Sequence, residues 1–233
     1  MSEQSLKIII GLTGGIACGK STAGKIFKEL GWDVISTDQI VAELLQGDDE
    51  VISEIKSRWG DKVIKNSGLD RKAIGRIVFR YEDERKWLES ILHPRVRMKW
   101  ENAVEQSEAK KNIIEIPLLF ENNLAECFDY TICVYASEMT QMKRLLDRGL
   151  TKEESNDRIK SQLPINEKSQ LADIVLLGGS SLSFLKRQIS YLHAHIFEPH
   201  ALNYSHAPKK KTDRGSPKRG DSQYRKRGRY FYR

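Results

Sequence analysis

Short apolar runs rich in β-branched residues recur along the chain, and longer charged segments with helical spacing separate them. The five runs cover residues 7–13, 32–37, 112–116, 129–135 and 173–177. Parallel strands need long crossover connections, usually helices, so strands spaced in this way form a parallel sheet with helices on both faces. The pattern therefore predicts an α/β fold, a three-layer sandwich with a five-stranded parallel sheet.

Two of the connecting segments are too long or too charged to be simple crossovers. About seventy residues separate the second run from the third, and they are rich in Arg, Lys, Glu and Trp with helical character. We interpret residues 38–110 as a helical insertion over the strand ends, where α/β proteins bind substrates. Residues 141–171 form a charged helical segment interrupted at Gly149, which we interpret as a mobile lid. The core of the predicted domain, 1–202, then consists of residues 7–37, 111–140 and 172–198.

The excess positive charge lies at the carboxyl end of the chain. Residues 205–233 contain 11 Lys or Arg and two Asp, whereas the first 204 residues contain 28 basic and 30 acidic residues. The segment 203–233 interleaves cations with tyrosines and a phenylalanine, and its composition predicts a disordered basic tail. Such a tail could bind nucleic acid through phosphate contacts and stacking, attach weakly to anionic membranes, or bind nothing. The net positive charge of the chain therefore gives no information about what the predicted folded domain binds.

Composition also excludes several classes of protein. The longest apolar run, Ile8–Leu12, is far shorter than the roughly 20 residues of a membrane-spanning helix, so we expect no membrane span. The first residues, MSEQSLK, lack the apolar region of a secretory signal, and the three cysteines lack metal-ligand spacing. We therefore expect a cytoplasmic protein with reduced thiols, and we expect it to be a monomer.

A glycine-rich motif follows the first predicted strand and opens a helix. Residues 14–21 read GGIACGKS, which satisfies the eight-position P-loop pattern. Glycines let the backbone turn tightly, so that successive amide N–H groups can face a phosphate, and the helix adds its positive dipole end. The expected nucleotide contacts are Gly14, Gly15, Ile16, Ala17, Cys18, Gly19, Lys20, Ser21 and Thr22.

The polar members of this motif have distinct expected tasks. Lys20 would lie along the β- and γ-phosphates and act in catalysis, Ser21 would place its hydroxyl on Mg²⁺, and Thr22 would contact the α-phosphate. The alternative for the motif is a glycine-rich turn with a purely structural role. Cys18 could be a site of redox control or an ordinary variable position of the loop. The GTPase signatures D-x-x-G and N-K-x-D are absent, which favours an ATP-dependent small-molecule kinase.

Asp38 follows the second predicted strand in the run STD. A carboxylate at a strand end across the sheet from the P-loop could orient an attacking hydroxyl and receive its proton late in a loose transfer. The alternative is that Asp38 caps the helix that follows, and both roles could hold at once.

Six segments occur in an order typical of one enzyme family: GLTGGIACGKST, STD, LHPRVR, EIPLLFE, QMKRLLDR and DRIKSQLPINEKSQLAD. The chain resembles the dephospho-CoA kinases over about residues 7–190. The resemblance implies transfer of the γ-phosphate of ATP to the ribose 3′-hydroxyl of dephospho-CoA, the last step of coenzyme A synthesis. It also implies a P-loop core, a helical lobe that binds CoA, and a lid.

The resemblance assigns residues to the acceptor side. Asp38 matches the family's proposed catalytic base, and His93, Arg95 and Arg97 lie in the segment that holds the acceptor. Arginine forks and a histidine donor suit the pyrophosphate of such an acceptor. The alternative for His93 and Pro94 is a helix terminus with a hydrogen-bonded core histidine.

The third predicted strand leads into an acid and an apolar wall. We expect Glu115 near Mg²⁺, directly or through water. Leu118 is expected to line the acceptor pocket, and Glu121 to bind a ribose or position an arginine. Plain core packing is the alternative for Leu118, Leu119 and Phe120.

Three arginines of the predicted lid are candidates for phosphate contacts. Arg144 and Arg148 lie one helical turn apart and are expected to stabilise the transferring phosphoryl group, with Arg148 also holding the nucleotide. Arg158 is expected to bind substrate, and a solvated helix face is the alternative for all three. Residues 176–181 read LLGGSS where the family often has an Asn-containing turn near the adenine, so no adenine contact is assigned.

Two other functions remain compatible with these residues. Another small-molecule kinase, for a nucleoside or nucleotide, would share the phosphate-binding residues and differ in the insertion. A nucleic-acid-associated NTPase anchored by its tail would lose function when residues 205–233 are removed, whereas the kinase would keep nearly unchanged turnover of dephospho-CoA.

Overall fold

The computed structural model describes residues 7–65, 68–195 and 197, so the predicted tail at 203–233 lies outside the described residues. The chain divides into two compact units. The first unit consists of Met1–Val34 and Ala109–Arg233, and the second unit consists of Ile35–Glu108. The P-loop and the predicted lid belong to the first unit, and Asp38 and His93 belong to the second.

All five predicted strands are present and form one sheet in the order β2-β5-β1-β6-β7. The strands are β1 (Ile8–Gly14), β2 (Asp33–Ser36), β5 (Lys111–Glu115), β6 (Tyr130–Tyr135) and β7 (Ile174–Leu177). β1 pairs in parallel with both β5 and β6, and β6 pairs in parallel with β7. The predicted α/β class and five-stranded parallel sheet are confirmed.

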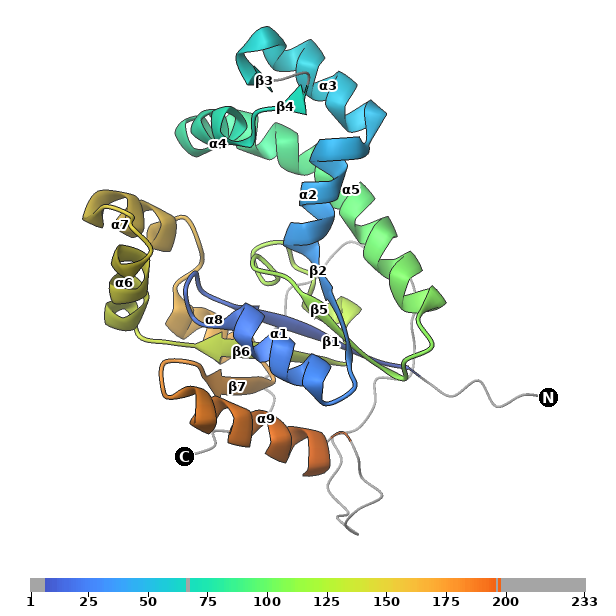
Figure 1. Ribbon diagram of the computed structural model, residues 1–233, viewed down its shortest axis with the longest axis vertical. Helices are drawn as coiled ribbons and strands as arrows, with labels where there is room; N and C mark the ends of the chain where they lie inside the picture. Colours follow the sequence, from blue (N-terminus) through green and yellow to red (C-terminus); the bar gives the residue numbers. More distant parts are fainter. Residues whose placement is uncertain (1–6, 66–67, 196, 198–233) are drawn as a thin grey trace, which may run out of the picture. The chain divides into compact units, whose positions relative to one another are not determined.

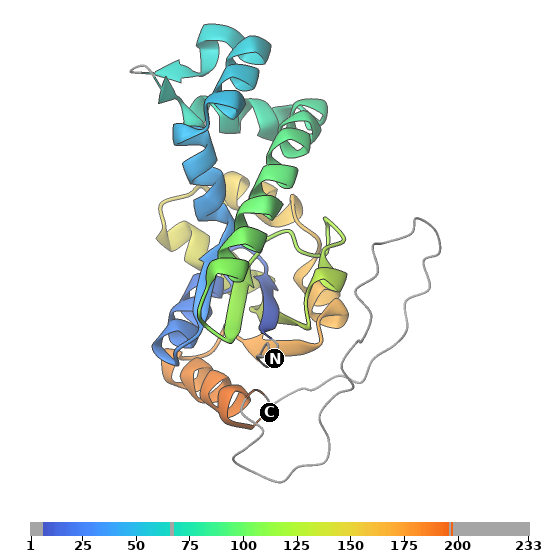
Figure 2. The ribbon, with the colours of Figure 1, turned by 90° about the vertical axis from the view of Figure 1, so that its right-hand side faces the viewer.

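Helices cover both faces of this sheet (Figure 1), as the second view also shows (Figure 2). α1 (Lys20–Glu29) and α9 (Leu182–His195) pack against each other on one face, and α8 (Ile165–Leu171) lies against β1 and β6 on the other. Strands covered on both faces are apolar on both faces, which is why they appear in the sequence as continuous hydrophobic runs. Fully buried side chains of the strands include Ile10, Leu12, Ile113, Ile132, Val134 and Leu176.

Two further helices and a short turn complete the first unit. They are α6 (Glu138–Asp147), α7 (Lys152–Lys160) and the 3₁₀ turn η2 (Ala125–Cys127). Gly149 has φ +85°, a left-handed conformation that glycine adopts readily, and it separates α6 from α7 as predicted. Thr151 and Glu154 form a capping box that starts α7. The division into core, insertion and lid remains a prediction.

The second unit is mainly helical. Its elements are α2 (Thr37–Gly47), α3 (Asp49–Trp59), the 3₁₀ turn η1 (Gly60–Val63), β3 (Ile64–Lys65), β4 (Gly68–Leu69), α4 (Arg71–Arg80) and α5 (Glu82–Gln106). β3 and β4 form an antiparallel hairpin that the pattern did not predict, because strands of two residues are too short to show alternation.

The long helix α5 carries the core of the second unit. Apolar side chains recur at every fourth position and are buried: Leu88, Leu92, Val96, Trp100 and Val104. At 3.6 residues per turn each step of four residues advances about 40°, so these side chains form a row that winds around the helix, and α5 contacts α2, α3 and α4. Among the described residues, none of the helices combines the length and apolar character needed to cross a membrane.

Candidate active site

The P-loop connects the end of β1 to the first turn of α1. Gly14 has φ +146° and Gly19, the N-cap of α1, has φ +103°. Both values lie where L side chains are strained. A Cβ at Gly14 would also meet the carbonyl oxygen of Val134 in β6. These glycines are therefore required by backbone geometry, and the loop turns directly into a helix N-terminus that suits an anion.

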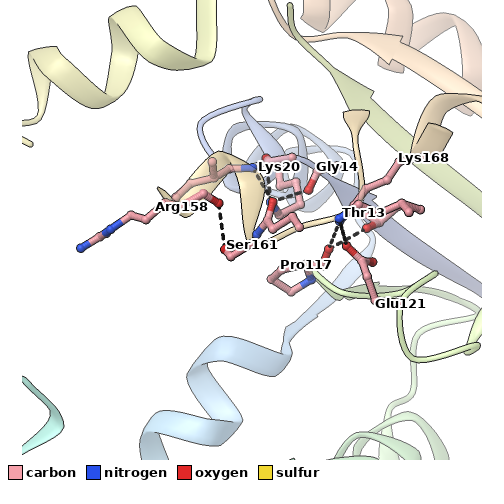
Figure 3. A network of polar contacts seen from close by, with 12 residues as sticks. Thr13, Gly14, Lys20, Pro117, Glu121, Arg158, Ser161 and Lys168 are labelled. Atoms are coloured by element: carbon pink, nitrogen blue, oxygen red, sulfur yellow. Dashed lines mark hydrogen bonds and ion pairs between the residues drawn. The ribbon is translucent and has the colours of Figure 1, made fainter. Parts of the chain in front are cut away.

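Lys20 folds back over the loop that precedes it. Its Nζ donates to the carbonyl oxygens of Gly14 and Gly15 at 2.9 and 3.1 Å, and Figure 3 shows Lys20 lying beside Gly14. The ammonium is only partly buried. It is thus a positioned point charge at the mouth of the loop, where P-loop lysines meet the terminal phosphates of a nucleotide.

Ser21 and Glu115, the two residues predicted to hold Mg²⁺, are direct partners. The Ser21 Oγ donates to Glu115 Oε1 at 2.9 Å. Glu115 ends β5 and is only 7% exposed. A hydroxyl and a carboxylate are oxygen ligands of the kind that Mg²⁺ prefers, so this pair fits the ion.

Arg144 of α6 links two backbone segments around the P-loop. Its Nη1 donates to the carbonyl oxygen of Ala17 at 2.9 Å and its Nη2 to that of Gly178 at 2.8 Å. Gly178 follows β7, and a Cβ there would collide with the carbonyl oxygen of Cys18. Gly178 of the LLGGSS run therefore lets this turn approach the P-loop, a reason that the sequence alone did not reveal.

The other two lid arginines lie in more open surroundings. Arg148 is the exposed C-cap residue of α6, and Arg158 is exposed near the end of α7. In Figure 3 the Arg158 side chain points away from Lys20, and the Arg158 carbonyl oxygen accepts from Ser161 Oγ at 3.0 Å. Of the three predicted arginines, Arg144 is therefore the one that the structure brings to the P-loop by hydrogen bonds.

A buried network fixes Glu121 (Figure 3). The Lys168 side chain has no exposed surface, and its Nζ lies 2.7 Å from Glu121 Oε1 and donates to the Pro117 carbonyl oxygen at 2.7 Å. Glu121 Oε1 also accepts from the backbone N–H of Leu163 at 2.9 Å, and Thr13 Oγ1 donates to the same Pro117 oxygen at 3.2 Å. Glu121 is thus bound to Leu163 and Lys168 in the last third of the predicted lid.

The candidates in the second unit lie on helices. Asp38 is the second residue of α2 and is exposed, and the helix is capped instead by Ser36, whose Oγ accepts from the N–H of Gln39 at 3.4 Å. The N-cap alternative for Asp38 is therefore wrong. His93 is exposed in the middle of α5, with Pro94 inside the helix, so the alternative of a helix terminus with a core histidine is also wrong.

Both acceptor arginines form ion pairs within the second unit. Arg95 Nη2 lies 3.1 Å from Glu50 Oε2 and 3.0 Å from Glu54 Oε1, so it braces α5 against α3. Arg97 Nε lies 2.8 Å from Glu101 Oε1, one turn further along α5. The structure therefore shows these guanidinium groups engaged with carboxylates of their own unit.

Comparison with known proteins agrees with this geometry. The family model described as dephospho-CoA kinase matches residues 8–183. A dephospho-CoA kinase from Halalkalibacterium halodurans is 37% identical over 187 residues, which are 78% of this chain and 93% of that protein. The chain belongs to the dephospho-CoA kinase family.

Two solved structures are also similar. A Thermus thermophilus protein superposes with a TM-score of 0.72 at 33% identity, covering 82% of this chain and 98% of that one. A dephospho-CoA kinase from Campylobacter jejuni gives a TM-score of 0.63 at 30% identity, covering 84% of this chain and 100% of that one. The family resemblance seen in the motifs therefore extends to the fold.

The predicted apolar wall, residues 118–120, belongs partly to the hydrophobic core. Leu119 has no exposed surface and Phe120 packs against the hydrophobic core, so core packing is confirmed for these two residues. Leu118 is half-buried.

Cys18, inside the P-loop, is a core residue. Its thiol is buried and donates to the Ala136 carbonyl oxygen at 3.9 Å. Burial raises the pKa of the Cys18 thiol, and burial also raises the pKa of Cys133 to about 12. Since the thiolate is the reactive form, both thiols are poor nucleophiles at neutral pH, and the structure favours the ordinary loop position for Cys18 over redox control.

Three residues at the site of this family member were not singled out from the sequence. They are Lys168, Gln162 and Gly178, to which the sequence analysis assigns no role. Each of them contacts residues more than 30 positions away in the chain, so no local pattern marks them. A lysine or glutamine in a charged segment is normally exposed.

Proposed function

We propose that this chain transfers the γ-phosphate of ATP to the ribose 3′-hydroxyl of dephospho-CoA, giving CoA and ADP. The observation that carries the proposal is the P-loop geometry, with the Lys20 ammonium on the carbonyls of Gly14 and Gly15, inside the stretch that matches the family. A loop of this kind binds a nucleoside triphosphate and stabilises charge on its terminal phosphates. The acceptor is assigned from the family, whose relatives are named for it.

In the proposed reaction the 3′-hydroxyl oxygen attacks the γ-phosphorus in line. The bond between that phosphorus and the oxygen bridging to the β-phosphate breaks, and ADP leaves. The hydroxyl proton passes late to the carboxylate of Asp38, which also orients the attacking oxygen. The Lys20 ammonium stabilises the charge of the transferring group, together with the backbone amides of residues 14–22 other than Ile16, whose N–H donates to Gln162 Oε1.

We propose that Ser21 and Glu115 hold Mg²⁺, directly or through water. Their hydrogen bond of 2.9 Å brings a hydroxyl and a buried carboxylate together, which supports this assignment. When bound, the ion would neutralise charge on the β- and γ-phosphate oxygens.

The acceptor contacts are proposed from the family pattern. His93, Arg95 and Arg97 are proposed to bind the acceptor beside Asp38, while Leu118 lines its pocket. Arg95 and Arg97 would first have to leave their carboxylate partners. Exposed ion pairs contribute at most about 1 kcal/mol, so an exchange for a pyrophosphate costs little.

On the side of the first unit, Arg144, Arg148 and Arg158 are proposed to neutralise phosphate charge. Arg144 is also proposed to position the P-loop through the Ala17 carbonyl. Glu121 is proposed to act by holding the turn after β5 rather than by free hydrogen bonding, because Lys168 and Leu163 already engage it.

We further propose that the protein works in the cytoplasm as a monomer, with the kinase domain at 1–202, the acceptor-binding insertion at 38–110 and the lid at 141–171. Buried reduced thiols at Cys18 and Cys133 suit a reducing compartment.

A coupled ADP-release assay tests the proposed function. The full chain is supplied with ATP and Mg²⁺, and then with dephospho-CoA, adenosine or AMP as the acceptor. Turnover that depends on dephospho-CoA and survives removal of residues 205–233 is the expected result. Turnover with a nucleoside or nucleotide alone, or turnover that disappears with the tail, would overturn the proposal.

A further inference from the structure

The P-loop is hydrogen-bonded by a side chain from the far end of the predicted lid. The backbone N–H of Ile16 donates to Gln162 Oε1 at 2.9 Å, although the two residues are 146 positions apart. A backbone N–H can only donate, so the acceptor must be the carboxamide oxygen rather than its nitrogen. Gln162 lies between α7 and α8, outside both helices.

The same peptide group reaches Lys20 on its other side. The carbonyl oxygen of Gly15, which belongs to the Gly15–Ile16 peptide, accepts from Lys20 Nζ at 3.1 Å and from the N–H of Cys18 at 3.3 Å. In a planar trans peptide the N–H and C=O point in opposite directions. Holding the N–H of Ile16 therefore also fixes the direction of the carbonyl that holds the ammonium.

The segment that carries Gln162 is itself anchored. The next residue, Leu163, donates its N–H to Glu121 Oε1 at 2.9 Å, and the buried Lys168 binds the same carboxylate oxygen and the Pro117 carbonyl. The Glu121 carboxylate and the Pro117 carbonyl, both on the turn after β5, thus hold the segment that contains Gln162. Gln162 therefore lies on a backbone segment that these contacts hold to the turn after β5, within the predicted lid.

A glycine at position 15 makes this support necessary. Glycine adopts many backbone conformations, so the Gly15–Ile16 peptide plane is weakly restrained by its own sequence. If the plane turned over, the carbonyl would leave the ammonium and an N–H dipole would face it, which is unfavourable for a cation.

We propose that Gln162 is a positioning residue for phosphoryl transfer: its carboxamide oxygen holds the Gly15–Ile16 peptide so that the Gly15 carbonyl places the Lys20 ammonium for the γ-phosphate. This inference rests on the proposed function, since it deepens the role given to Lys20. It also makes the exit segment of the predicted lid part of the phosphate site.

Three variants of the full chain test the inference. Gln162→Leu removes the acceptor oxygen at nearly unchanged size, Gln162→Glu keeps an acceptor oxygen, and Gln170→Leu repeats the first change at an exposed position of α8. One lost hydrogen bond corresponds to about a tenfold effect. We expect Gln162→Leu to lower kcat about tenfold, Gln162→Glu to recover kcat to within about threefold of wild type, and Gln170→Leu to match wild type.

A second readout does not need the acceptor. Isothermal titration calorimetry compares the binding of ADP with that of a non-hydrolysable ATP analogue. Gln162→Leu should raise the Kd of the analogue about tenfold and the Kd of ADP less than about threefold. Equal losses of kcat in Gln162→Leu and Gln162→Glu, or equal weakening of both nucleotides, would overturn the inference. Absence of wild-type turnover with dephospho-CoA would instead overturn the proposed function, and the titration would still decide the role of Gln162.

Discussion

The two units hold their candidate residues in different ways. In the first unit, Lys20 lies on backbone carbonyls, and Ser21 donates to the buried Glu115. In the second unit, Asp38 and His93 are exposed on helices. We infer that the fold preorganises the phosphate side, whereas the acceptor side is completed only when substrate arrives.

The ion pairs of the two units show the same contrast. Arg95 of the second unit is shared between two glutamates that are 83% and 42% exposed. Such exposed pairs contribute about 0–1 kcal/mol, so they can exchange partners. The Lys168–Glu121 pair of the first unit involves a lysine with no exposed surface, and breaking such a pair costs about 3–5 kcal/mol. Changes in the first unit should therefore affect stability and kcat, and changes in the second unit should affect the KM for the acceptor.

Lys168→Met should have the largest effect. It leaves the Glu121 carboxylate without its buried cation, so the free energy of unfolding should fall by about 3–5 kcal/mol in a urea titration. The double variant Lys168→Met/Glu121→Leu replaces the pair by apolar groups and should regain part of that loss, because the Leu163 N–H then loses the carboxylate to which it donates. If the single variant unfolds at the wild-type urea concentration, the pair does not stabilise the first unit.

Lys20→Met should have the second largest effect. Loss of the positioned ammonium should lower kcat about 10²- to 10³-fold, because the charge acts on the transferring phosphoryl group. Lys25→Met removes the same charge from an exposed position of α1 and should leave the rate unchanged. Steady-state ADP release measures both variants. Similar rates for the two would show that the Lys20 charge does not act on the reaction.

Asp38→Asn should lower kcat by at least about 10²-fold while ATP binding survives, because the amide can neither accept the proton nor orient the hydroxyl as a carboxylate does. Asp49→Asn makes the same change at an exposed position in the first turn of α3 and serves as the matched control. Single-turnover kinetics with saturating ATP separate chemistry from binding. Full activity of the Asp38 variant would remove this residue from the mechanism.

Arg95→Gln should have the smallest effect. We expect the KM for dephospho-CoA to rise about tenfold with kcat changed much less, as for one charge-assisted hydrogen bond to a phosphate. Arg76→Gln, an exposed arginine of α4 in the same unit, controls for the change in net charge. An unchanged KM with a lower melting temperature would mean that Arg95 only braces α5 against α3.

Features set by residues close together in the sequence could be predicted, whereas contacts between residues far apart in the sequence could not. The strands and the P-loop are set by local patterns, and Ser21 and Glu115 could be assigned to one site because Ser21 belongs to the P-loop motif and Glu115 ends a strand. The hydrogen bond from Arg144 to the Ala17 carbonyl joins residues 127 positions apart, and the bond between Gln162 and Ile16 joins residues 146 positions apart. Only the packed fold brings such groups together, so neither was predictable from one sequence.

The burial of Lys168 was also not predictable. Its neighbours in the sequence are polar, and a lysine is almost never fully buried unless it is paired. The partner, Glu121, lies 47 positions earlier in the chain. The same limit explains why Ser36 rather than Asp38 caps α2: the run STD offers side-chain oxygens at three successive positions, and backbone geometry decides which of them is the cap.

The most direct test of the central claim is to follow the terminal phosphate itself. The full chain is incubated with ATP labelled in the γ-phosphate and with dephospho-CoA, and the product is analysed for the position of the label. We expect one labelled phosphate on the ribose 3′-oxygen of CoA for each ADP formed. Label released only as inorganic phosphate, or attached at any other position of the acceptor, would contradict it.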